Sequence, residues 1–438
     1  MTATFASLPT PITVAHRGGA ITMPDQATET FAAGVARVGH VVEADVHKIA
    51  DGTTVCMHDN TVDRTTTGSG DTAALTLAGR MRLRVDAGTW FGSRWPSDLH
   101  VPSFDEFLDI TGDHRPICPE AKNAGSGQLV TDAVVARGLE ASTMVQSFLL
   151  DELVAPMASG IDVGVLHSTG VGLDFDAIAA TGVEWALLKH TAAPSRFTDA
   201  IAAGLRVGAW TVNTRGVRDE LEALGVELFF SDDPWYLIGN HRVDADPFGA
   251  QTYWDGYRQS AGTSGTRNAR WFAPDEFGWD NNSGSYGSTQ AVRQGWGCPI
   301  GDDADADAFT IDFDLRLTDS VSGTRWAGIF ICDDSDAIDF VDNSTGNGYH
   351  ILFRRSGDVS IYRITDGAAV SISSTSYAGM SLWSKIGLRV TVTPTQVKVT
   401  RTDIAATELV VSDTAHRGGY FWFTANSADP RFSNVKIS

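Results

Sequence analysis

The first half of the chain alternates short apolar runs with stretches in which apolar residues recur every three or four positions. The strand-like runs are 11–15, 41–46, 54–57, 116–119, 144–148, 163–167, 185–188, 206–212 and 228–231. The helix-like stretches are 28–38, 129–140, 174–181, 196–203 and 216–224. Strands that alternate with helices predict a parallel sheet. Seven or eight such units in about 230 residues match the size of a TIM-like (β/α)8 barrel, and a doubly wound sheet is the alternative.

The pattern changes after residue 240. Residues 241–268 are rich in Gly, Ser, Thr and Asp and are typical of a domain boundary. Beyond them, short runs alternate apolar and polar residues without helical spacing. These runs are 308–317, 326–332, 349–354, 359–364, 386–392, 396–401 and 419–424. Many short strands separated by turn residues predict an antiparallel sandwich or jelly roll. We therefore expect a barrel over residues 1–240, a linker over 241–268 and a β-sandwich over 269–438.

Composition and charge narrow the choice of partners. The 438 residues are 42% hydrophobic and 20% charged, as in ordinary globular proteins. The net charge of −21 disfavours binding to nucleic acid or to anionic membranes. No apolar run reaches the roughly 18 residues of a membrane span, and the first residues, MTATFASLP, lack the basic and apolar regions of a signal peptide. Two locations stay open: the cytoplasm, or a virion or cell exterior reached by lysis.

Three carboxylates are predicted to lie together at the carboxyl ends of barrel strands, where the active site of this fold lies. Glu43 and Asp45 share one face of the second strand because side chains alternate, and Glu120 ends a later strand. Like charges raise each other's pKa, and a hard divalent cation relieves their repulsion. An all-oxygen ligand set suits Mg²⁺ or Ca²⁺ better than zinc.

Basic side chains follow the same strands. His16 and His58 could serve as general acid and general base. Arg17 and Lys122 supply positive charge for a phosphate group. Together with the three carboxylates, this inventory indicates metal-assisted cleavage of a phosphodiester.

These residues stand in motifs that resemble those of the glycerophosphodiester phosphodiesterase family. The motifs are HRGG (16–19), EADV (43–46), HDNTVDRTTTG (58–68), PEAK (119–122), QSF (146–148), AWTVN (209–213) and FFSDDPW (229–235). The resemblance covers roughly residues 12–238 and implies a TIM-like barrel that releases glycerol 3-phosphate and an alcohol. In the reaction that this resemblance implies, the attacking group is a water or the glycerol hydroxyl next to the phosphate.

The same resemblance implies a role for each candidate residue. Glu43, Asp45 and Glu120 match the family's metal ligands. His16 and His58 match its acid and base, in an order that stays open. Arg17 and Lys122 match the phosphate-contacting cations, and Trp210 is similar to an aromatic residue at the glycerol end of the substrate.

Three features depart from the family pattern or stand outside it. The family usually has Pro-Glu-Asn-Thr after its HRG motif, whereas residues 24–27 read Pro-Asp-Gln-Ala, so the groups that support the site are expected to differ. A second AHRGG stands at 415–419 with no Glu-x-Asp after it, and we interpret it as a chance repeat. Asp232 and Asp233 are expected to cap a loop near the last strand.

The second half resembles concanavalin-like sandwich domains of the laminin-G and glucanase type. The likeness is one of pattern, as in DAFTIDFDLRL at 307–317. Such domains often bind glycans by stacking sugars on exposed aromatic rings. The tryptophans available for this are 254, 271, 279, 296, 326, 383 and 422, although core packing is the expected role for most of them. The acidic runs 302–307 and 333–336 could hold Ca²⁺ or be solvated loops.

Three functional hypotheses follow. The first is an enzyme that hydrolyses glycerophosphodiesters with a divalent cation. A sugar-binding sandwich would suit a wall polymer such as glycerol-phosphate teichoic acid, as in a phage tail depolymerase. The second is an inactive barrel that serves as a scaffold for glycan or receptor binding. The third is a phospholipase D of the sphingomyelinase type.

Overall fold

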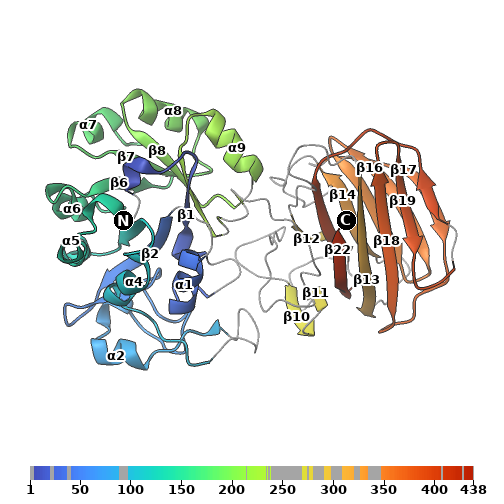
Figure 1. Ribbon diagram of the computed structural model, residues 1–438, viewed down its shortest axis with the longest axis horizontal. Helices are drawn as coiled ribbons and strands as arrows, with labels where there is room; N and C mark the ends of the chain where they lie inside the picture. Colours follow the sequence, from blue (N-terminus) through green and yellow to red (C-terminus); the bar gives the residue numbers. More distant parts are fainter. Residues whose placement is uncertain are drawn as a thin grey trace. The chain divides into compact units, whose positions relative to one another are not determined.

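The computed structural model describes most of the chain, with gaps between the described segments. The described residues are 4–19, 24–36, 41–87, 97–213, 215–232, 234, 237, 269–273, 276–279, 291–296, 308–319, 326–333, 347–405, 408–426 and 429–437. The chain divides into two compact units, Met1–Ile238 and Gly239–Ser438 (Figure 1). The predicted linker, 241–268, lies outside the described residues.

The first unit is a closed barrel of eight parallel strands. Its strands are β1 (Ile12–Ala15), β2 (Val41–Lys48), β4 (Ile117–Ala121), β5 (Met144–Ser147), β6 (Asp162–His167), β7 (Trp185–Lys189), β8 (Arg206–Trp210) and β9 (Leu228–Ser231). β1 pairs with both β9 and β2, which closes the sheet. The barrel prediction is therefore confirmed, and the doubly wound sheet, which would have two open edges, is wrong.

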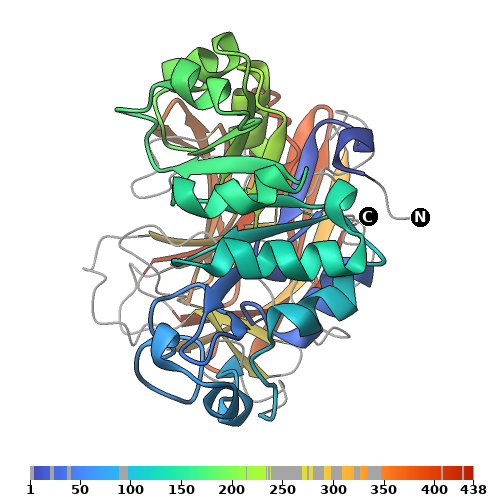
Figure 2. The same cartoon turned by 90° about the vertical axis from the view of Figure 1, so that its left-hand side faces the viewer.

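The run 54–57 does not belong to the barrel wall. Its strand, β3 (Thr54–Cys56), pairs antiparallel with the end of β2, so it forms a hairpin on the rim. The helices of the unit are α1 (Thr28–Ala36), α2 (Leu77–Arg82), α4 (Phe104–Thr111), α5 (Ser126–Arg137), α6 (Val154–Ala158), α7 (Phe175–Ala180), α8 (Pro194–Ala202) and α9 (Arg215–Ala223). Figure 2 looks onto the helices that cover the outside of the barrel.

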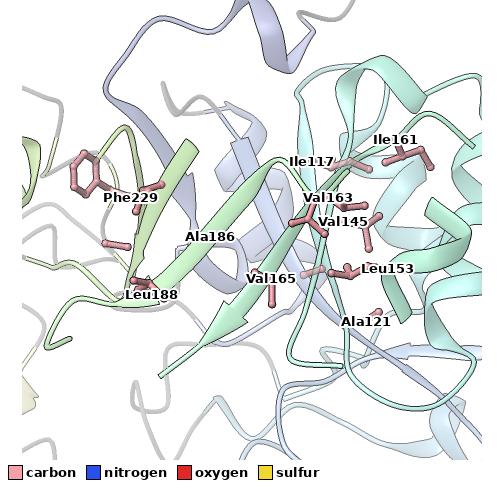
Figure 3. Packing of buried hydrophobic residues seen from close by; sticks show 14 of the residues in the cluster. Ile117, Ala121, Val145, Leu153, Ile161, Val163, Val165, Ala186, Leu188 and Phe229 are labelled. Carbon is pink, nitrogen blue, oxygen red and sulfur yellow. The ribbon is translucent and has the colours of Figure 1, made fainter. Parts of the chain in front are cut away.

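Alternation along the strands separates two apolar clusters. The cluster inside the barrel includes Ile12, Val14, Val41, Cys118, Met144, Leu166, Trp185, Leu187, Leu228 and Phe230. The cluster between strands and helices includes Ile117, Ala121, Val145, Val163, Val165, Ala186, Leu188 and Phe229 (Figure 3). Burial of both sets removes apolar surface from water. The alternation also fixes which residue at the end of each strand faces inward.

A buried carboxylate anchors the segment that follows β4. Glu152 accepts hydrogen bonds from the backbone amides of Gly125 (2.9 Å) and Gly127 (2.7 Å) at the start of α5. These amides have no partner within the helix, so the carboxylate satisfies them and complements the positive end of the helix dipole. Its contact fixes the turn that leads from Lys122 into α5.

The second unit is built from two antiparallel sheets. One has the order β10-β11-β22-β13-β18-β19-β20 and the other β12-β21-β14-β15-β16-β17. Their strands are β10 (Ala269–Ala273), β11 (Glu276–Trp279), β12 (Ala291–Trp296), β13 (Phe309–Asp319), β14 (Trp326–Asp333), β15 (Gly348–Arg354), β16 (Asp358–Thr365), β17 (Ala368–Ser376), β18 (Lys385–Thr393), β19 (Gln396–Arg401), β20 (Leu409–Val411), β21 (Tyr420–Asn426) and β22 (Asp429–Ile437). The prediction of an all-β second domain is confirmed.

One apolar core joins strands of both sheets. Residues such as Ile311 and Leu315 on β13 belong to the same buried cluster as Ile329 on β14 and Ile351 on β15. In the second AHRGG, Arg417 donates to the backbone carbonyls of Thr393 and Asp413, which is a structural role. In the described part of the chain, no helix is long and apolar enough to cross a bilayer.

We predict that Glu152→Ala lowers the free energy of unfolding by about 1–3 kcal/mol, because it leaves one buried and one partly buried amide without an acceptor. Chemical denaturation of the full chain measures the loss. Glu222→Ala, at an exposed position of α9, is the matched control and should change stability by less than about 0.5 kcal/mol. Equal stability of Glu152→Ala and the unaltered chain would contradict the anchoring role.

Candidate active site

The HRGG motif forms a tight turn directly after β1. Three successive residues have positive φ: Arg17 (54°), Gly18 (84°) and Gly19 (101°). A Cβ on Gly18 would lie 2.9 Å from Cγ2 of Thr30, so both its conformation and its surroundings require glycine. In this turn the backbone amide of Arg17 points at β2 and donates to Oε2 of Glu43 at 2.6 Å.

The three predicted carboxylates lie together. Glu43 and Asp45 share the inward face of β2, and Asp45 stands opposite Glu120 in the register of β2 and β4. All three are buried, with exposed fractions of 1%, 0% and 7%. One oxygen from each can be chosen so that all lie within 4.8 Å of one another.

Burial and mutual repulsion make this cluster unfavourable as three free anions. Burial, and next to it the charge of Asp45, raises the pKa of Glu43 well above its usual value. The same two causes raise the pKa of Glu120 to about 8. Burial also acts to raise the pKa of Asp45, but neighbouring positive groups, first of all Lys122, hold that pKa below its usual range.

The donor set fits a hard divalent cation. Oδ1 of Asp45 is buried and has no well-aligned hydrogen-bond donor among the described residues, although Nζ of Lys122 lies 3.2 Å away. The ligand atoms offered are carboxylate oxygens, as Mg²⁺ and Ca²⁺ prefer. A bound dication would lower the pKa of Glu43 and Glu120 by favouring their ionised forms.

Each predicted catalytic histidine is held by a carboxylate. Nδ1 of His16 lies 2.6 Å from Oδ1 of Asp232, and Nδ1 of His58 lies 2.6 Å from Oδ1 of Asp59. Ionised carboxylates can only accept, so Nδ1 carries the proton in both rings and Nε2 is left for chemistry. Both imidazoles are close enough to Asp45 to act on its pKa.

Asp232 has a role that the sequence interpretation missed. Among the described residues its side chain binds His16, and Asn213 donates to its other oxygen at 2.8 Å. Asp233 lies outside the described residues. A signal was present in the sequence: Leu228 and Phe230 face the barrel interior, so alternation places Asp232 at the mouth.

The altered 24–27 segment supplies direct support to the site. Nε2 of Gln26 donates to Oδ2 of Asp45 at 2.7 Å, and Oε1 of Gln26 accepts the amide of Asp45 at 2.9 Å. Asp25 lies between Arg17 (3.1 Å) and Arg64 (3.0 Å). In this segment Gln26 therefore holds the carboxylate of Asp45, and Asp25 holds Arg17 beside it.

A chain of opposite charges connects the two halves of the site. Arg64 pairs with Asp25 and also with Asp59, whose other oxygen holds His58. Arg17 pairs with Asp25, and its Nε lies 3.6 Å from Asp45. Lys122 pairs with Glu120 at 2.8 Å. The structure therefore links the candidate residues on β1, β2 and β4 through ion pairs.

Trp210 lies on the far side of the barrel mouth, at the end of β8. Its Nε1 donates to the backbone carbonyl of Leu187 at 3.1 Å, and its ring packs edge-on against Phe148 with centroids 5.6 Å apart. The indole is partly exposed. With Phe148, Trp210 therefore forms an aromatic wall at the mouth.

The fold and the site define a class: (β/α)8-barrel enzymes whose acidic cluster and paired histidines suit the hydrolysis of phosphate esters. The chain belongs to the Glycerophosphoryl diester phosphodiesterase family, whose model matches residues 16–235, just over half of the sequence. This membership confirms the resemblance and the prediction of a phosphodiesterase.

Curated relatives and solved structures match the same half of the chain. The glycerophosphodiester phosphodiesterase of Caldanaerobacter subterraneus subsp. tengcongensis is 26% identical over 236 residues, which cover 52% of this chain and 96% of the relative. That of Bacillus subtilis is 29% identical over 261 residues, 51% of this chain and 84% of the relative. The structure of an Oleispira antarctica phosphodiesterase in complex with the product sn-glycerol-3-phosphate is 24% identical, covers 52% of this chain and 95% of that one, and has a TM-score of 0.47.

We predict that Asp232→Asn lowers kcat for a glycerophosphodiester by at least about 100-fold, because an amide no longer fixes His16 with its proton on Nδ1. Steady-state kinetics measure the loss. Asp176→Asn, an exposed aspartate of α7, is the matched control and should keep the kcat of the unaltered chain. A kcat for Asp232→Asn close to that of the control would show that the pair with His16 does not matter to the reaction.

Proposed function

We propose that this chain hydrolyses glycerophosphodiesters to glycerol 3-phosphate and an alcohol with a divalent cation, Mg²⁺ or Ca²⁺, held by Glu43, Asp45 and Glu120. The observation that carries the proposal is the buried set of three carboxylates beside two histidines, each with Nδ1 2.6 Å from a carboxylate oxygen. A bound cation would offset negative charge on the phosphate oxygens.

The histidines would transfer protons, and the basic side chains would bind the phosphate. With Nδ1 bound to a carboxylate, the neutral ring of one histidine accepts a proton at Nε2 from the attacking group. Attack by water gives glycerol 3-phosphate directly. Attack by the glycerol hydroxyl next to the phosphate gives a cyclic glycerol phosphate, which a water then opens to glycerol 3-phosphate in a second proton-transfer cycle. The other ring, protonated, donates from Nε2 to the oxygen of the leaving alcohol as its bond to phosphorus breaks. Which ring serves as base stays open. Arg17 and Lys122 add positive charge beside the phosphate.

Trp210 would line the glycerol end of the substrate. Its partial exposure, and the aromatic wall that it forms with Phe148, support a contact with the carbon chain of the substrate. The charged residues would contact the phosphate, and this aromatic wall would contact the less polar glycerol.

A wall polymer of glycerol phosphate, such as teichoic acid, is the proposed natural substrate. The two-unit architecture supports this choice, because a free small metabolite would not need a second domain. A protein of this kind would act as a depolymerase of the phage-tail type, delivered to its target by lysis. The intact carboxylates and histidines argue against the alternative of an inactive scaffold.

A glycan at the sandwich is the proposed means of targeting. Trp383 follows β17, and its indole is 64% exposed. Its backbone has φ of 67°, a conformation that costs energy for a bulky residue, and its amide donates to Leu317. A large ring held in solvent by a strained backbone supports stacking against a sugar.

One observation favours the phospholipase D alternative. Phe148, Leu149 and Leu150 follow β5 at the barrel mouth and are 45%, 45% and 52% exposed. An apolar rim of this kind would suit a lipid substrate. The two enzymes differ in their product, because a phospholipase D leaves the phosphate on the lipid and releases no glycerol 3-phosphate.

We predict metal-dependent release of glycerol 3-phosphate from glycerophosphocholine or from purified poly(glycerol phosphate). Assays with Mg²⁺, Ca²⁺ or EDTA should show activity only with a cation, and Glu43→Gln and His58→Ala should each lower the rate by at least about 100-fold. Asp176→Asn is the control, and thermal unfolding checks that every variant is folded.

The substrate arms separate the functional classes. Preference for the polymer supports the depolymerase, and preference for glycerophosphocholine supports a metabolic enzyme. Conversion of lysophosphatidylcholine or sphingomyelin without glycerol 3-phosphate would support the phospholipase D instead. Undiminished hydrolysis in EDTA would overturn the metal-dependent reaction.

We predict that Trp383→Ala weakens binding of the full chain to purified wall glycans about 5- to 10-fold, in line with about 1–1.4 kcal/mol for an exposed aromatic contact. Affinity electrophoresis in glycan-containing gels measures the change. Val370→Ala, which truncates another exposed apolar residue of the same unit, should leave mobility as it is. Equal retardation of both variants would reject Trp383 as the sugar contact.

A further inference from the structure

Lys189 ends β7 on the inward face of the barrel. Trp185 and Leu187 belong to the cluster inside the barrel, whereas Ala186 and Leu188 belong to the cluster under the helices. Alternation therefore continues the inward series to Lys189, which is still within the strand. Its side chain is exposed, as expected for an inward residue at the open end.

The charge of Lys189 distinguishes it from the other cations of the site. Arg17, Arg64 and Lys122 each form ion pairs with carboxylates of the same network. Within the described segments, Lys189 has no carboxylate within ion-pair distance. In a chain of net charge −21, an unpaired lysine at the barrel mouth is available to an anionic ligand.

The position of Lys189 relative to the metal-site carboxylates is set by strand order. β7 lies four strands from β2 in either direction around the eight-stranded barrel. An eight-stranded barrel is only wide enough for side chains or one small ligand, so a substrate anchored at β2 also meets β7. Lys189 pairs in register with Trp210 and lies one strand nearer to β6, so a substrate whose glycerol contacts Trp210 can place its other substituent against Lys189.

We propose that Lys189 selects substrates whose leaving alcohol carries a second anionic group, such as the next phosphate of a glycerol phosphate chain. The inference rests on the proposed function and specifies its substrate class. The three carboxylates and their partners would take the scissile phosphate, and the ammonium group across the mouth would take the following one. A cationic leaving group such as choline would be disfavoured by the same charge.

The test compares three substrates that differ in the charge of the leaving alcohol. They are glycerophosphoglycerol, its derivative with a phosphate on the distal glycerol, and glycerophosphocholine. In Lys189→Gln, the ratio of kcat/KM for the phosphorylated over the neutral diester should fall about tenfold. Lys189→Glu should lower it further and raise the relative kcat/KM for glycerophosphocholine. Lys48→Gln, an exposed lysine on the outward face of β2, is the matched control and should keep the ratio.

A binding measurement separates this inference from the proposed reaction. The binding measurement uses the full chain with His58→Ala, in which hydrolysis is suppressed. When Lys189→Gln is added to this variant, calorimetric titration should show that the affinity for the phosphorylated diester falls about tenfold relative to the affinity for the neutral diester. The proposal would be overturned if the preference for the phosphorylated over the neutral diester, in kcat/KM or in affinity, were the same with Lys189→Gln as with Lys189 unaltered. An equal loss in Lys48→Gln would also overturn it, by assigning the effect to net charge. Absence of hydrolysis together with Lys189-dependent binding would overturn only the reaction.

Discussion

The burial of three carboxylates at one point of the barrel is the constraint on which the rest of the site depends. Glu43, Asp45 and Glu120 are almost inaccessible to water, and isolated charges in such a place are costly. Hydrogen-bond donors and cations compensate: the amide of Arg17 binds Glu43, Gln26 binds Asp45, and Lys122 binds Glu120. Each of these contacts dictates local structure around it.

The shape of the HRGG turn follows from that compensation. The amide of Arg17 reaches Glu43 only because three consecutive residues take left-handed conformations, and Gly18 has no room for a side chain beside Thr30. The strain is placed at the site itself, and the surrounding barrel holds it. The side chain of Arg17 is then free to join Asp25, which carries the network on to Arg64 and so to the carboxylate that holds His58.

The sequence was sufficient for the barrel, the sandwich and the charged residues near the strand ends. Strands that are buried on both faces show themselves as apolar runs, and alternation within them identifies the side chains that face inward. Helix α4 was missed although its capping box is legible, with Ser103 and Glu106 bonding each other's amides. Strand β17 was missed for a different reason: its residues are mostly small, polar and exposed, and pairing with β16 makes it a strand.

Contacts between distant segments could not be read from spacing. His16 and Asp232 are 216 positions apart, and only closure of the barrel brings β1 beside β9. Likewise, the replacement of the family's Pro-Glu-Asn-Thr by 24–27 could be seen in the sequence, but its effect depends on the position of Asp45 and Arg64. In this chain Gln26 both donates to and accepts from Asp45, a contact that only the folded structure reveals.

The acidic chain has to bind an anionic substrate. A net charge of −21 repels a phosphodiester, but salt screens this repulsion at distances beyond about 8–10 Å. Attraction must therefore arise at short range inside the mouth, where Arg17 and Lys122 would face the scissile phosphate and Lys189 has no ion pair with a described carboxylate. Most cations of the described site form ion pairs with neighbouring carboxylates and so stabilise the buried cluster. The cations of the mouth therefore have two separate roles. Arg17, Arg64 and Lys122 stabilise the buried carboxylates on which the proposed reaction depends. Lys189, at the end of β7, would remain available to select the substrate.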